Sequence, residues 1–340
     1  MRAAIALVES GLVPDALTRA GIRRLCARRL ELEAAGGEAR REAFLASLAR
    51  GPIAPLPEKA NEQHYEVPPA FMRLVLGPQL KYSCALYETG GESLAAAEEA
   101  MLALTAARAG LADGQDILEL GCGWGSLTLW MARRFPNARI TAVSNSAAQR
   151  DFILARAGEL GLDGVTVLTR DMNDFHAPGT YDRVVSVEMF EHMRNYPALF
   201  GRVASWLKPD GKLFVHVFCH RSFVYPFEDE GDDDWMARHF FSGGLMPSES
   251  LMLLFQDELV HEKMWVVDGR HYQRTADDWL ANLDRRRDEA LEALAPLHGA
   301  AAAVQLRRWR VFFMACAELF GYADGSEWRV AHYLFRRRGA

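Results

Sequence analysis

Three ionisable side chains that could transfer a proton lie in the run Glu188-Met189-Phe190-Glu191-His192-Met193. If the chain turns helical here, Glu188, Glu191 and His192 stand at positions i, i+3 and i+4 and share one face. Neighbouring carboxylates raise the pKa of an imidazole, which favours a proton acceptor active near neutral pH. The alternative is an ordinary helix start, where acidic side chains interact favourably with the positive end of the helix dipole. The apolar residues of the run argue for burial and so favour a catalytic patch.

A second run could hold a ligand through its backbone. It reads Asp116-Ile117-Leu118-Glu119-Leu120-Gly121-Cys122-Gly123-Trp124-Gly125, and a helical pattern resumes at Ser126. The order of strand, glycine turn and helix is that of the first βα unit of a nucleotide-type α/β fold. Glycines let backbone N–H groups approach a ligand closely, and the helix N-terminus adds partial positive charge. An ordinary βα turn also favours glycine, so this motif alone leaves cofactor binding open.

The neighbouring strand ends argue against a dinucleotide cofactor. The glycine spacing is Gly-x-Gly-x-Gly, and the second expected strand ends in Ser144-Asn145-Ser146, without the acid that would bond an NAD ribose. The third expected strand ends in Arg170-Asp171-Met172. There a carboxylate could bond an adenine amine and an apolar side chain could pack on its ring, although Asp171 could instead cap a loop.

The composition limits the class of protein. The chain has 340 residues, half of them apolar, and a formal net charge of −6, which gives no general nucleic-acid signal. Five scattered cysteines indicate free thiols in a reducing compartment. No apolar stretch approaches 18 residues, and no secretory signal pattern is present. We therefore expect a cytoplasmic protein without a nucleic-acid partner or membrane contact. We also expect no metal, because the run from His216 to His220 alternates along a strand.

Alternating elements must position these groups. We expect strands at Asp116–Leu120, Arg139–Ser144, Val165–Thr169, Arg183–Val187 and Lys212–Phe218. Helices are expected at Glu92–Ala109, Ser126–Arg134, Ala147–Leu160 and Tyr196–Leu207. This alternation predicts a doubly wound α/β fold with a parallel sheet and helices on both faces. Two further runs, Lys263–Val267 and Trp328–Phe335, would complete a seven-stranded sheet with one antiparallel edge strand.

The remaining segments suggest additions to this sheet. Residues 1–60 are expected to be an N-terminal helical region followed by a proline-containing linker, Gly51–Glu58, and residues 61–340 the main domain. The N-terminal arginines could contact an anionic membrane, but interleaved glutamates favour a solvated helical face. Residues 219–325 are expected to form a helical cap over the carboxyl ends of the strands. An aromatic stripe there, Trp309 to Met314, could be plain core or could pack an aryl group or an ammonium.

Together with the two runs described first, several others resemble one family. They are Tyr82-Ser83-Cys84, His216-Val217-Phe218-Cys219-His220, Phe241-Ser242-Gly243-Gly244 and Glu318-Leu319-Phe320-Gly321-Tyr322. These runs resemble the S-adenosylmethionine-dependent methyltransferases of the cyclopropane fatty acid synthase superfamily, in its coclaurine N-methyltransferase-like branch. The resemblance implies a class I, Rossmann-like methyltransferase fold and S-adenosyl-L-methionine as the cofactor.

The resemblance also implies roles for individual residues. The cofactor would contact Tyr82, Ser83, Glu119, Gly121, Gly123, Asn145, Gln149, Asp171 and Met172. The expected catalytic residues are Glu191, His192, Glu188 and Glu66, and the expected substrate contacts are Tyr65, Trp309 and Phe312.

Within the superfamily, the acceptor is either an amine or a lipid alkene. Lipid cyclopropanation commonly uses bicarbonate as a base, and the resemblance would place it at Cys84, Glu191 and His216. Phe218 stands where the lipid enzymes have a smaller aliphatic residue, and the acidic run Asp232–Asp234 suits a cationic substrate. We therefore expect N-methylation of a small aromatic amine, benzylisoquinoline-like or arylalkylamine-like. Methyl transfer to unsaturated lipid acyl chains and a non-catalytic, cofactor-sensing protein are the alternatives. The oligomeric state stays open, with a homodimer among the alternatives.

Overall fold

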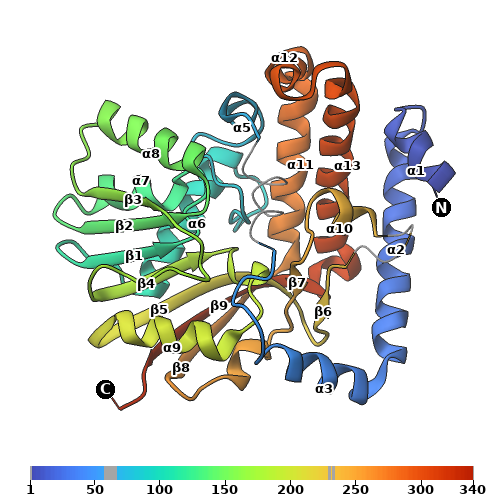
Figure 1. Cartoon of the computed structure of the whole chain (residues 1–340). Helices are drawn as coiled ribbons and strands as arrows, with labels where there is room; N and C mark the ends of the chain where they lie inside the picture. Colours follow the sequence, from blue (N-terminus) through green and yellow to red (C-terminus); the bar gives the residue numbers. More distant parts are fainter. Residues whose placement is uncertain (1, 57–66, 229–230, 232–233, 340) are drawn as a thin grey trace.

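The computed structural model describes residues 2–56, 67–228, 231 and 234–339, with side chains from residue 5 onward. A mixed sheet forms its centre, in the strand order β3-β2-β1-β4-β5-β9-β8 (Figure 1). The strands are β1 Asp116–Leu120, β2 Arg139–Ser144, β3 Val165–Thr169, β4 Tyr181–Val187, β5 Leu207–His220, β8 Leu259–Val267 and β9 Trp328–Arg337. All seven expected strands are confirmed, the last four being longer than expected.

The position of the antiparallel strand differs from the expectation. β9 runs antiparallel to both β5 and β8, so the reversed strand lies second from the edge and β8 forms the edge itself. The reason is the path of the chain. After β8 the chain builds helices beyond the carboxyl ends of the parallel strands, and it re-enters the sheet from that side, between β5 and β8 (Figure 1). The expected antiparallel edge strand was therefore wrong.

Helices cover both faces of the sheet because neighbouring strand residues point to opposite sides. Ile117 and Val185 pack with α6 (Leu94–Ala109) and α7 (Ser126–Arg134) on one face. Leu118 and Val184 pack with α9 (Tyr196–Trp206) on the other. α8 (Ala147–Glu159) packs with α7 against β2 and β3. The helices expected between the strands are confirmed to within two residues.

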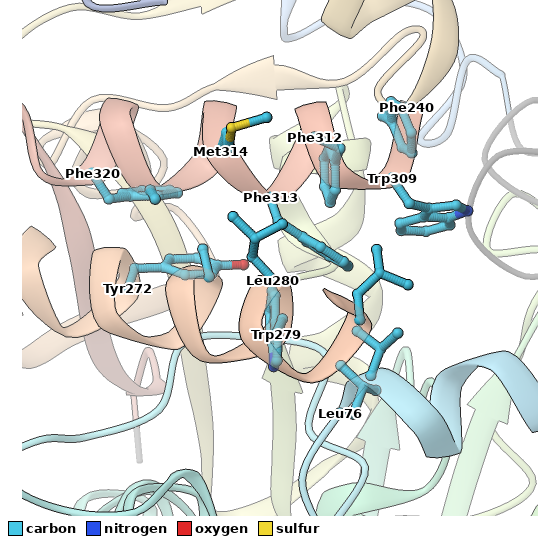
Figure 2. Packing of buried hydrophobic residues seen from close by; sticks show 14 of the residues in the cluster. Leu76, Phe240, Tyr272, Trp279, Leu280, Trp309, Phe312, Phe313, Met314 and Phe320 are labelled. Atoms are coloured by element: carbon cyan, nitrogen blue, oxygen red, sulfur yellow. The ribbon is translucent and has the colours of Figure 1, made fainter. Parts of the chain in front are cut away.

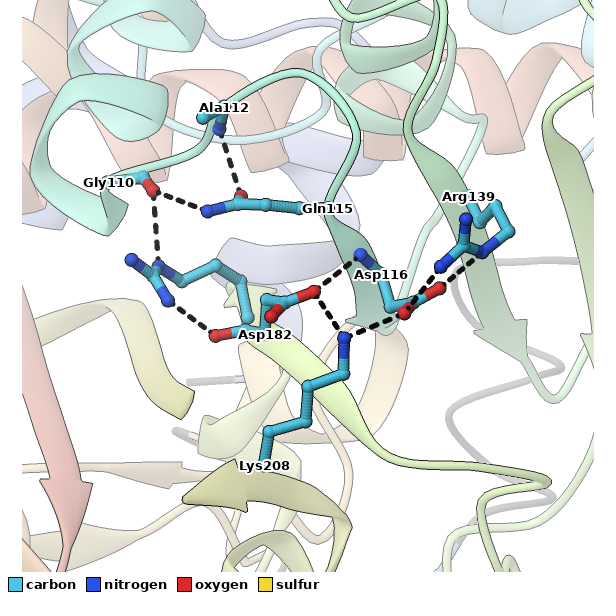
Figure 3. A network of polar contacts seen from close by, with 8 residues as sticks. Gly110, Ala112, Gln115, Asp116, Arg139, Asp182 and Lys208 are labelled. Carbon is cyan, nitrogen blue, oxygen red and sulfur yellow. Dashed lines mark hydrogen bonds and ion pairs between the residues drawn. The ribbon is translucent and has the colours of Figure 1, made fainter. Parts of the chain in front are cut away.

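Polar side chains join the amino ends of the central strands (Figure 3). The Lys208 ammonium lies 2.8 Å from the Asp116 carboxylate and 2.7 Å from that of Asp182. Arg139 pairs with Asp116 at 2.6 Å, and Asp182 accepts the Asp116 backbone N–H at 2.8 Å. These pairs are partly exposed and each contributes little stability. They occupy the amino edge of the sheet, which leaves the carboxyl edge for a ligand.

The cap is a helical layer with an aromatic interior (Figure 2). It contains α10 (Trp235–His239), α11 (Gly269–Arg285), α12 (Arg287–His298) and α13 (Ala302–Phe320). Tyr272 of α11 stacks on Phe320 of α13 with ring centroids 4.2 Å apart, and Phe240 stacks on Phe312 at 4.3 Å. The first pair joins α11 to α13, and the second joins the end of α10 to α13.

The N-terminal helices are α1 (Arg2–Glu9), α2 (Asp15–Ala35) and α3 (Gly37–Ser47). α1 and α2 pack on α13 of the cap, whereas Phe44 and Leu45 of α3 pack against the core on the α9 face of the sheet. Arg19 of α2 pairs with Glu318 at 2.9 Å and with Asp277 at 2.7 Å, and Arg23 pairs with Glu318 at 2.5 Å. The arginines expected on a solvated face therefore include two that anchor α2 to the cap. No helix in the described part of the chain combines the length and apolar character needed to cross a membrane.

The short elements complete the fold. They are α5 (Pro69–Val75), the strands β6 (Tyr225–Pro226) and β7 (Leu245–Met246), and the 3-10 helices η2 (Phe190–His192), η3 (Leu251–Leu254), η4 (Gly299–Ala301) and η5 (Tyr322–Gly325). β6 and β7 pair with each other outside the main sheet.

Candidate functional site

The glycine turn after β1 is shaped so that only glycine fits at its first position. Gly121 has φ +78°, and a Cβ added there would stand 2.7 Å from Cβ and Cγ of Met189. Gly123 has φ +51°, and an added Cβ would meet no described atom within 4 Å. The turn therefore presses against the loop after β4 at Gly121 and stays open at Gly123, where a ligand can approach the backbone.

A first cavity lies at the carboxyl ends of β2 and β3. Its lining includes Ser144, Asn145, Gln149, Asp171 and Met172 beside the two glycines. Both interpretations of Asp171 have support, since its Oδ1 accepts the Asn173 backbone N–H at 2.8 Å while the residue also lines the cavity. Carboxylate, amide and apolar groups thus converge on one space, as expected from the strand ends.

The wall of this first cavity includes a segment whose contribution the sequence analysis missed. Ala54 and Leu56 line it, although they belong to the segment expected to be a linker. Ala54 is buried, its backbone N–H donates to Asn173 Oδ1 at 2.9 Å, and its carbonyl accepts from Asn173 Nδ2 at 2.8 Å. An apolar pair, Ile53-Ala54, between prolines was the available signal.

A second cavity adjoins the first, and the two share Gly121, Gly123, Gln149, Met189 and His192 in their linings. Its polar part includes Lys81, Tyr82, Ser83 and Glu119. Its other walls include the aromatic side chains Phe218, Phe227, Phe241, Tyr272, Trp279, Phe312 and Phe320. The combined site therefore runs from a polar region at the carboxyl edge of the sheet into an aromatic chamber under the cap.

Glu188 lines this aromatic chamber. Its backbone has φ +49°, a left-handed conformation uncommon for a non-glycine residue. Oε1 accepts the Cys84 backbone N–H at 3.0 Å and lies 3.2 Å from His216 Nε2, while Oε2 accepts the Tyr272 hydroxyl at 2.6 Å. The side chain is 8 % exposed. Burial raises the pKa of Glu188, and the charge of Lys81 opposes that rise.

Glu188, Glu191 and His192 do not share a helical face, so that expectation was wrong. Glu188 is left-handed and lies before the helix, and η2 is a single 3-10 turn. The Glu191 side chain is fully buried and its Oε1 accepts the Phe218 backbone N–H at 2.8 Å. Among the described residues, Glu191 is behind the cavity walls, whereas Glu188 and His192 line the second cavity. The surface helix start is excluded as well, because Glu191 is buried.

Burial perturbs two further carboxyl groups near the site. Burial, and then the charge of Glu188, raises the pKa of Glu191 well above its ordinary value. Glu119 accepts the Thr128 hydroxyl through Oε2 at 2.5 Å, and burial raises the pKa of Glu119 to about 8. A buried carboxyl with a strongly raised pKa beside a cavity is typical of functional sites.

His192 connects the two cavities, since it lines both. Its ring centroid lies 4.5 Å from that of Phe241, which follows α10 of the cap. An imidazole at this junction can contact a ligand in either cavity.

The two aromatic residues predicted on α13 have different places. Phe312 lines the second cavity. Trp309 is 1 % exposed and packs against Phe71 and Phe240, with ring centroids 5.2 and 5.1 Å away, so within the described structure it belongs to the core behind the cavity. The helical stripe gave no signal to distinguish them.

Four residues with an expected role lie outside the part of the chain that the structure describes. Tyr65, Glu66, Asp232 and Asp233 are outside the described residues. Within the residues that are described, no cluster of three or more His, Cys, Asp or Glu side chains could hold a metal ion.

Comparisons with known proteins give three close similarities. A family model described as mycolic acid cyclopropane synthetase matches residues 56–327. (S)-coclaurine N-methyltransferase of Thalictrum flavum subsp. glaucum is 37 % identical over 97 % of this chain and 94 % of its own length. The enzyme of the same name from Papaver somniferum is 35 % identical over 97 % of each chain.

One solved structure covers nearly the whole chain. It is a crystal structure of coclaurine N-methyltransferase bound to N-methylheliamine and SAH. It superposes with a TM-score of 0.93 at 36 % identity and covers 98 % of both chains.

Proposed function

The chain belongs to the mycolic acid cyclopropane synthetase family, and from this premise we propose what its two cavities bind. The chain is an S-adenosyl-L-methionine-dependent N-methyltransferase, and its acceptor is a small aromatic amine. The named relatives act on coclaurine, a benzylisoquinoline, and we propose the benzylisoquinoline or arylalkylamine class for this enzyme. The cofactor would extend from the first cavity across the glycine turn, and the amine would occupy the aromatic chamber.

The residues of the site fit this cofactor. Gly123 leaves room for close backbone approach, Gly121 lets the turn pack against Met189, and Asn145, Gln149, Asp171 and Met172 offer polar and apolar contacts suited to an adenosine. Tyr82, Ser83 and Glu119 line the adjoining cavity, where the amino-acid part would lie. When bound, S-adenosyl-L-methionine supplies an electrophilic methyl group on its sulfonium sulfur. The first cavity therefore sets the position from which that methyl group faces the chamber.

The observation that carries the choice of an amine is the buried carboxylate of Glu188. An ionised carboxylate in an aromatic chamber attracts an ammonium and can accept its proton. It accepts hydrogen bonds from Cys84 N–H and from His216, two of the three groups that a bicarbonate ion would need in a lipid cyclopropanating enzyme. This use of both donors, together with the large side chain of Phe218 in the cavity wall, supports an amine over a lipid alkene.

The proposed mechanism is an in-line attack of the amine nitrogen on the methyl carbon that the bound cofactor would supply, with the sulfur as the leaving group. A protonated amine has no lone pair to attack, so Glu188 binds the ammonium and accepts its proton, with His192, which lines the same cavity, as a second acceptor. Glu191 would contribute from behind the cavity wall, where it accepts the Phe218 backbone N–H, and Glu66 and Tyr65 remain proposed contributors outside the described residues. Positioning by the aromatic walls, including Phe312, can supply about 7–11 kcal/mol of the barrier reduction. A general base typically contributes 10²–10⁴-fold, so positioning carries more of the catalysis.

The test is incubation with methyl-labelled S-adenosyl-L-methionine and a panel of secondary arylalkylamines and unsaturated phospholipids. We expect labelled N-methyl products and unmodified acyl chains. A gain of one methylene on acyl chains without amine products would instead support the lipid reaction. Cofactor binding without transfer to any acceptor, and without any effect of Glu191→Gln, would support a cofactor-sensing protein.

We also propose the organisation and location of the enzyme. Residues 1–60 would form an N-terminal helical region, and residues 61–340 the methyltransferase domain, with its cap at about 219–325. The contacts of Arg19 and Arg23 with α13 support an N-terminal region that steadies the cap. Five free cysteines, four of them buried, support a cytoplasmic location. There the enzyme would act on a small-molecule amine, as a monomer or a homodimer, without a nucleic-acid partner or membrane contact.

A further inference from the structure

A row of hydrogen-bonded side chains connects Glu188 to Arg108 on α6, along the face of the sheet that α6 covers. Arg108 Nη1 on α6 lies 2.8 Å from His332 Nδ1 on β9. His332 Nε2 lies 2.9 Å from Nδ1 of His216, its paired residue on β5, and His216 Nε2 lies 3.2 Å from Glu188 Oε1. Both imidazoles are 0 % exposed. Arg108 is partly exposed and its guanidinium lies over the Trp265 ring, 5.1 Å from the centroid.

The chemistry of arginine sets the direction of every bond in this row. A guanidinium donates hydrogen bonds and cannot accept one. His332 Nδ1 must therefore accept, which leaves the proton of the neutral ring on Nε2, from which it donates to His216. His216 then accepts through Nδ1 and donates from Nε2 to Glu188. Burial, with the charges of Arg108 and Lys81, lowers the pKa of both imidazoles, which keeps each ring neutral with a single proton.

The same chemistry excludes a proton channel along this row. A proton leaving Glu188 outward would require both histidines to reverse their tautomers. The last step would place an N–H of His332 against Arg108, which has no lone pair to receive it. The row can thus deliver hydrogen-bond donors to Glu188 but cannot carry protons away from it.

We propose that Arg108 is a positioning residue for methyl transfer, which acts through His332 and His216 to hold Glu188 in place as a carboxylate. Glu188 then keeps one oxygen bound by His216 and Cys84 and the other by Tyr272. This inference rests on the proposed function for its effect on turnover, whereas the direction of the hydrogen bonds is independent of any substrate.

Other charged and titratable groups also act on Glu188, so removal of Arg108 should shift its ionisation only partly. The groups facing it from the surrounding elements are Lys81 and Cys84 before α6, Glu191 in η2, His216 on β5, Tyr272 on α11 and Cys316 on α13. Lys81 remains in every variant below and continues to favour the carboxylate.

The first experiment measures the tautomers by ¹⁵N NMR on histidine-labelled, full-length enzyme. We expect His216 and His332 to be neutral with the proton on Nε2 between pH 6 and 9. Arg108→Met should give His332 a population with the proton on Nδ1, while Arg108→Lys, which still only donates, should preserve the wild-type spectrum. A wild-type His216 protonated on Nδ1, or an unchanged spectrum in Arg108→Met, overturns the proposal.

The second experiment measures the ionisation of Glu188 by ¹³C carboxyl titration and the pH profile of kcat on an amine that the wild type methylates. In Arg108→Met we expect both the Glu188 titration and the acid limb of kcat to move up by about one pH unit, about a tenfold loss on the acid side. Recovery is expected at high pH and in Arg108→Lys. Arg183→Met is the matched control, because Arg183 also binds the end of α6, through the Ala109 carbonyl.

The outcomes separate the two proposals. If Arg108→Met only lowers the melting temperature and leaves the Glu188 titration where it was, the positioning role is wrong. If Arg108→Met does not fold, the histidine tautomers of the wild type and of Arg108→Gln test the direction of the hydrogen bonds between Arg108 and Glu188. If the wild type methylates no amine, the proposed function fails, and the ¹⁵N and ¹³C spectra still decide the hydrogen-bond row.

Discussion

Glu188→Gln keeps the shape of the side chain at the centre of the proposed amine site and removes its charge. The wild-type carboxylate accepts three hydrogen bonds, from Cys84 N–H, His216 and the Tyr272 hydroxyl. A glutamine can place its amide oxygen where Cys84 and His216 both donate. Its NH₂ group then faces Tyr272, whose hydroxyl can rotate and accept. We therefore expect the variant to fold.

The magnitudes follow from these contacts. One rearranged neutral hydrogen bond is worth about 0.5–1.5 kcal/mol, so the stability should change by less than about 2 kcal/mol. The lost hydrogen bond to an ammonium, a charged group, is worth about 1.5–3 kcal/mol, which corresponds to a rise of about 10–150-fold in the KM of the amine. Loss of the proton acceptor should lower kcat by a further 10²–10⁴-fold, as is typical for a general base.

The assay measures kcat, the KM of the amine, the Kd of S-adenosyl-L-methionine by calorimetry and the melting temperature for each variant. The cofactor Kd should change by less than about threefold, because Glu188 is assigned to the amine. Tyr272→Phe is the matched control: it removes one hydrogen bond from the same carboxylate, keeps the charge, and should cost less than about tenfold in kcat. A Glu188→Gln enzyme with near-normal turnover and a lowered melting temperature would refute the catalytic role.

Three further predictions concern the cofactor cavity, the buried carboxyl beside it and the N-terminal region. Gly121→Ala should weaken S-adenosyl-L-methionine binding at least about tenfold in calorimetry, since a left-handed alanine costs about 1–2 kcal/mol and its Cβ would lie 2.7 Å from Met189. In the folded protein the pKa of Glu119 is raised to about 8, so Glu119 keeps a proton that the unfolded chain releases near pH 4.5. The cofactor-free wild type should therefore lose about 1.4 kcal/mol of stability per pH unit between these two pH values. Urea unfolding at pH 5.5 and 7.5 should show this loss in the wild type and not in Glu119→Gln. Glu318→Gln removes the carboxylate that holds Arg19 and Arg23 of α2, which should cost about 1 kcal/mol and be seen as faster hydrogen exchange confined to α2; exchange at the wild-type rate would mean that the remaining contacts, the Arg19–Asp277 pair among them, hold the helix.

The sequence by itself determined the sheet and the cofactor edge. Strand patterns of period two and the helices between them are local signals, because each residue's burial and backbone conformation follow from its near neighbours. Parallel strands place their carboxyl ends on one edge, which is why Gly121, Asn145 and Asp171 could be assigned to one site before any contact was known. A resemblance in short runs then supplied the family.

Local signals failed where a conformation depended on distant contacts. The left-handed conformation of Glu188 breaks the expected helical face, and its carboxylate is held by Cys84, His216 and Tyr272, from three segments far apart in the chain. Nothing in the spacing of the run could indicate these contacts. The direction of β9 likewise follows from the position of the cap helices and not from the strand's own pattern.

Only the tertiary structure decided which groups near the site act together. Arg108 and His332 are 224 positions apart in sequence, and Ala54 meets Asn173 across 119 positions. Hydrogen bonds of this kind depend on the register between strands and on which helix covers which face. The sequence thus determined the fold and the edge that binds the cofactor, because those depend on local periodicity. The partners that hold and orient Glu188 were decided by packing between segments far apart in the chain.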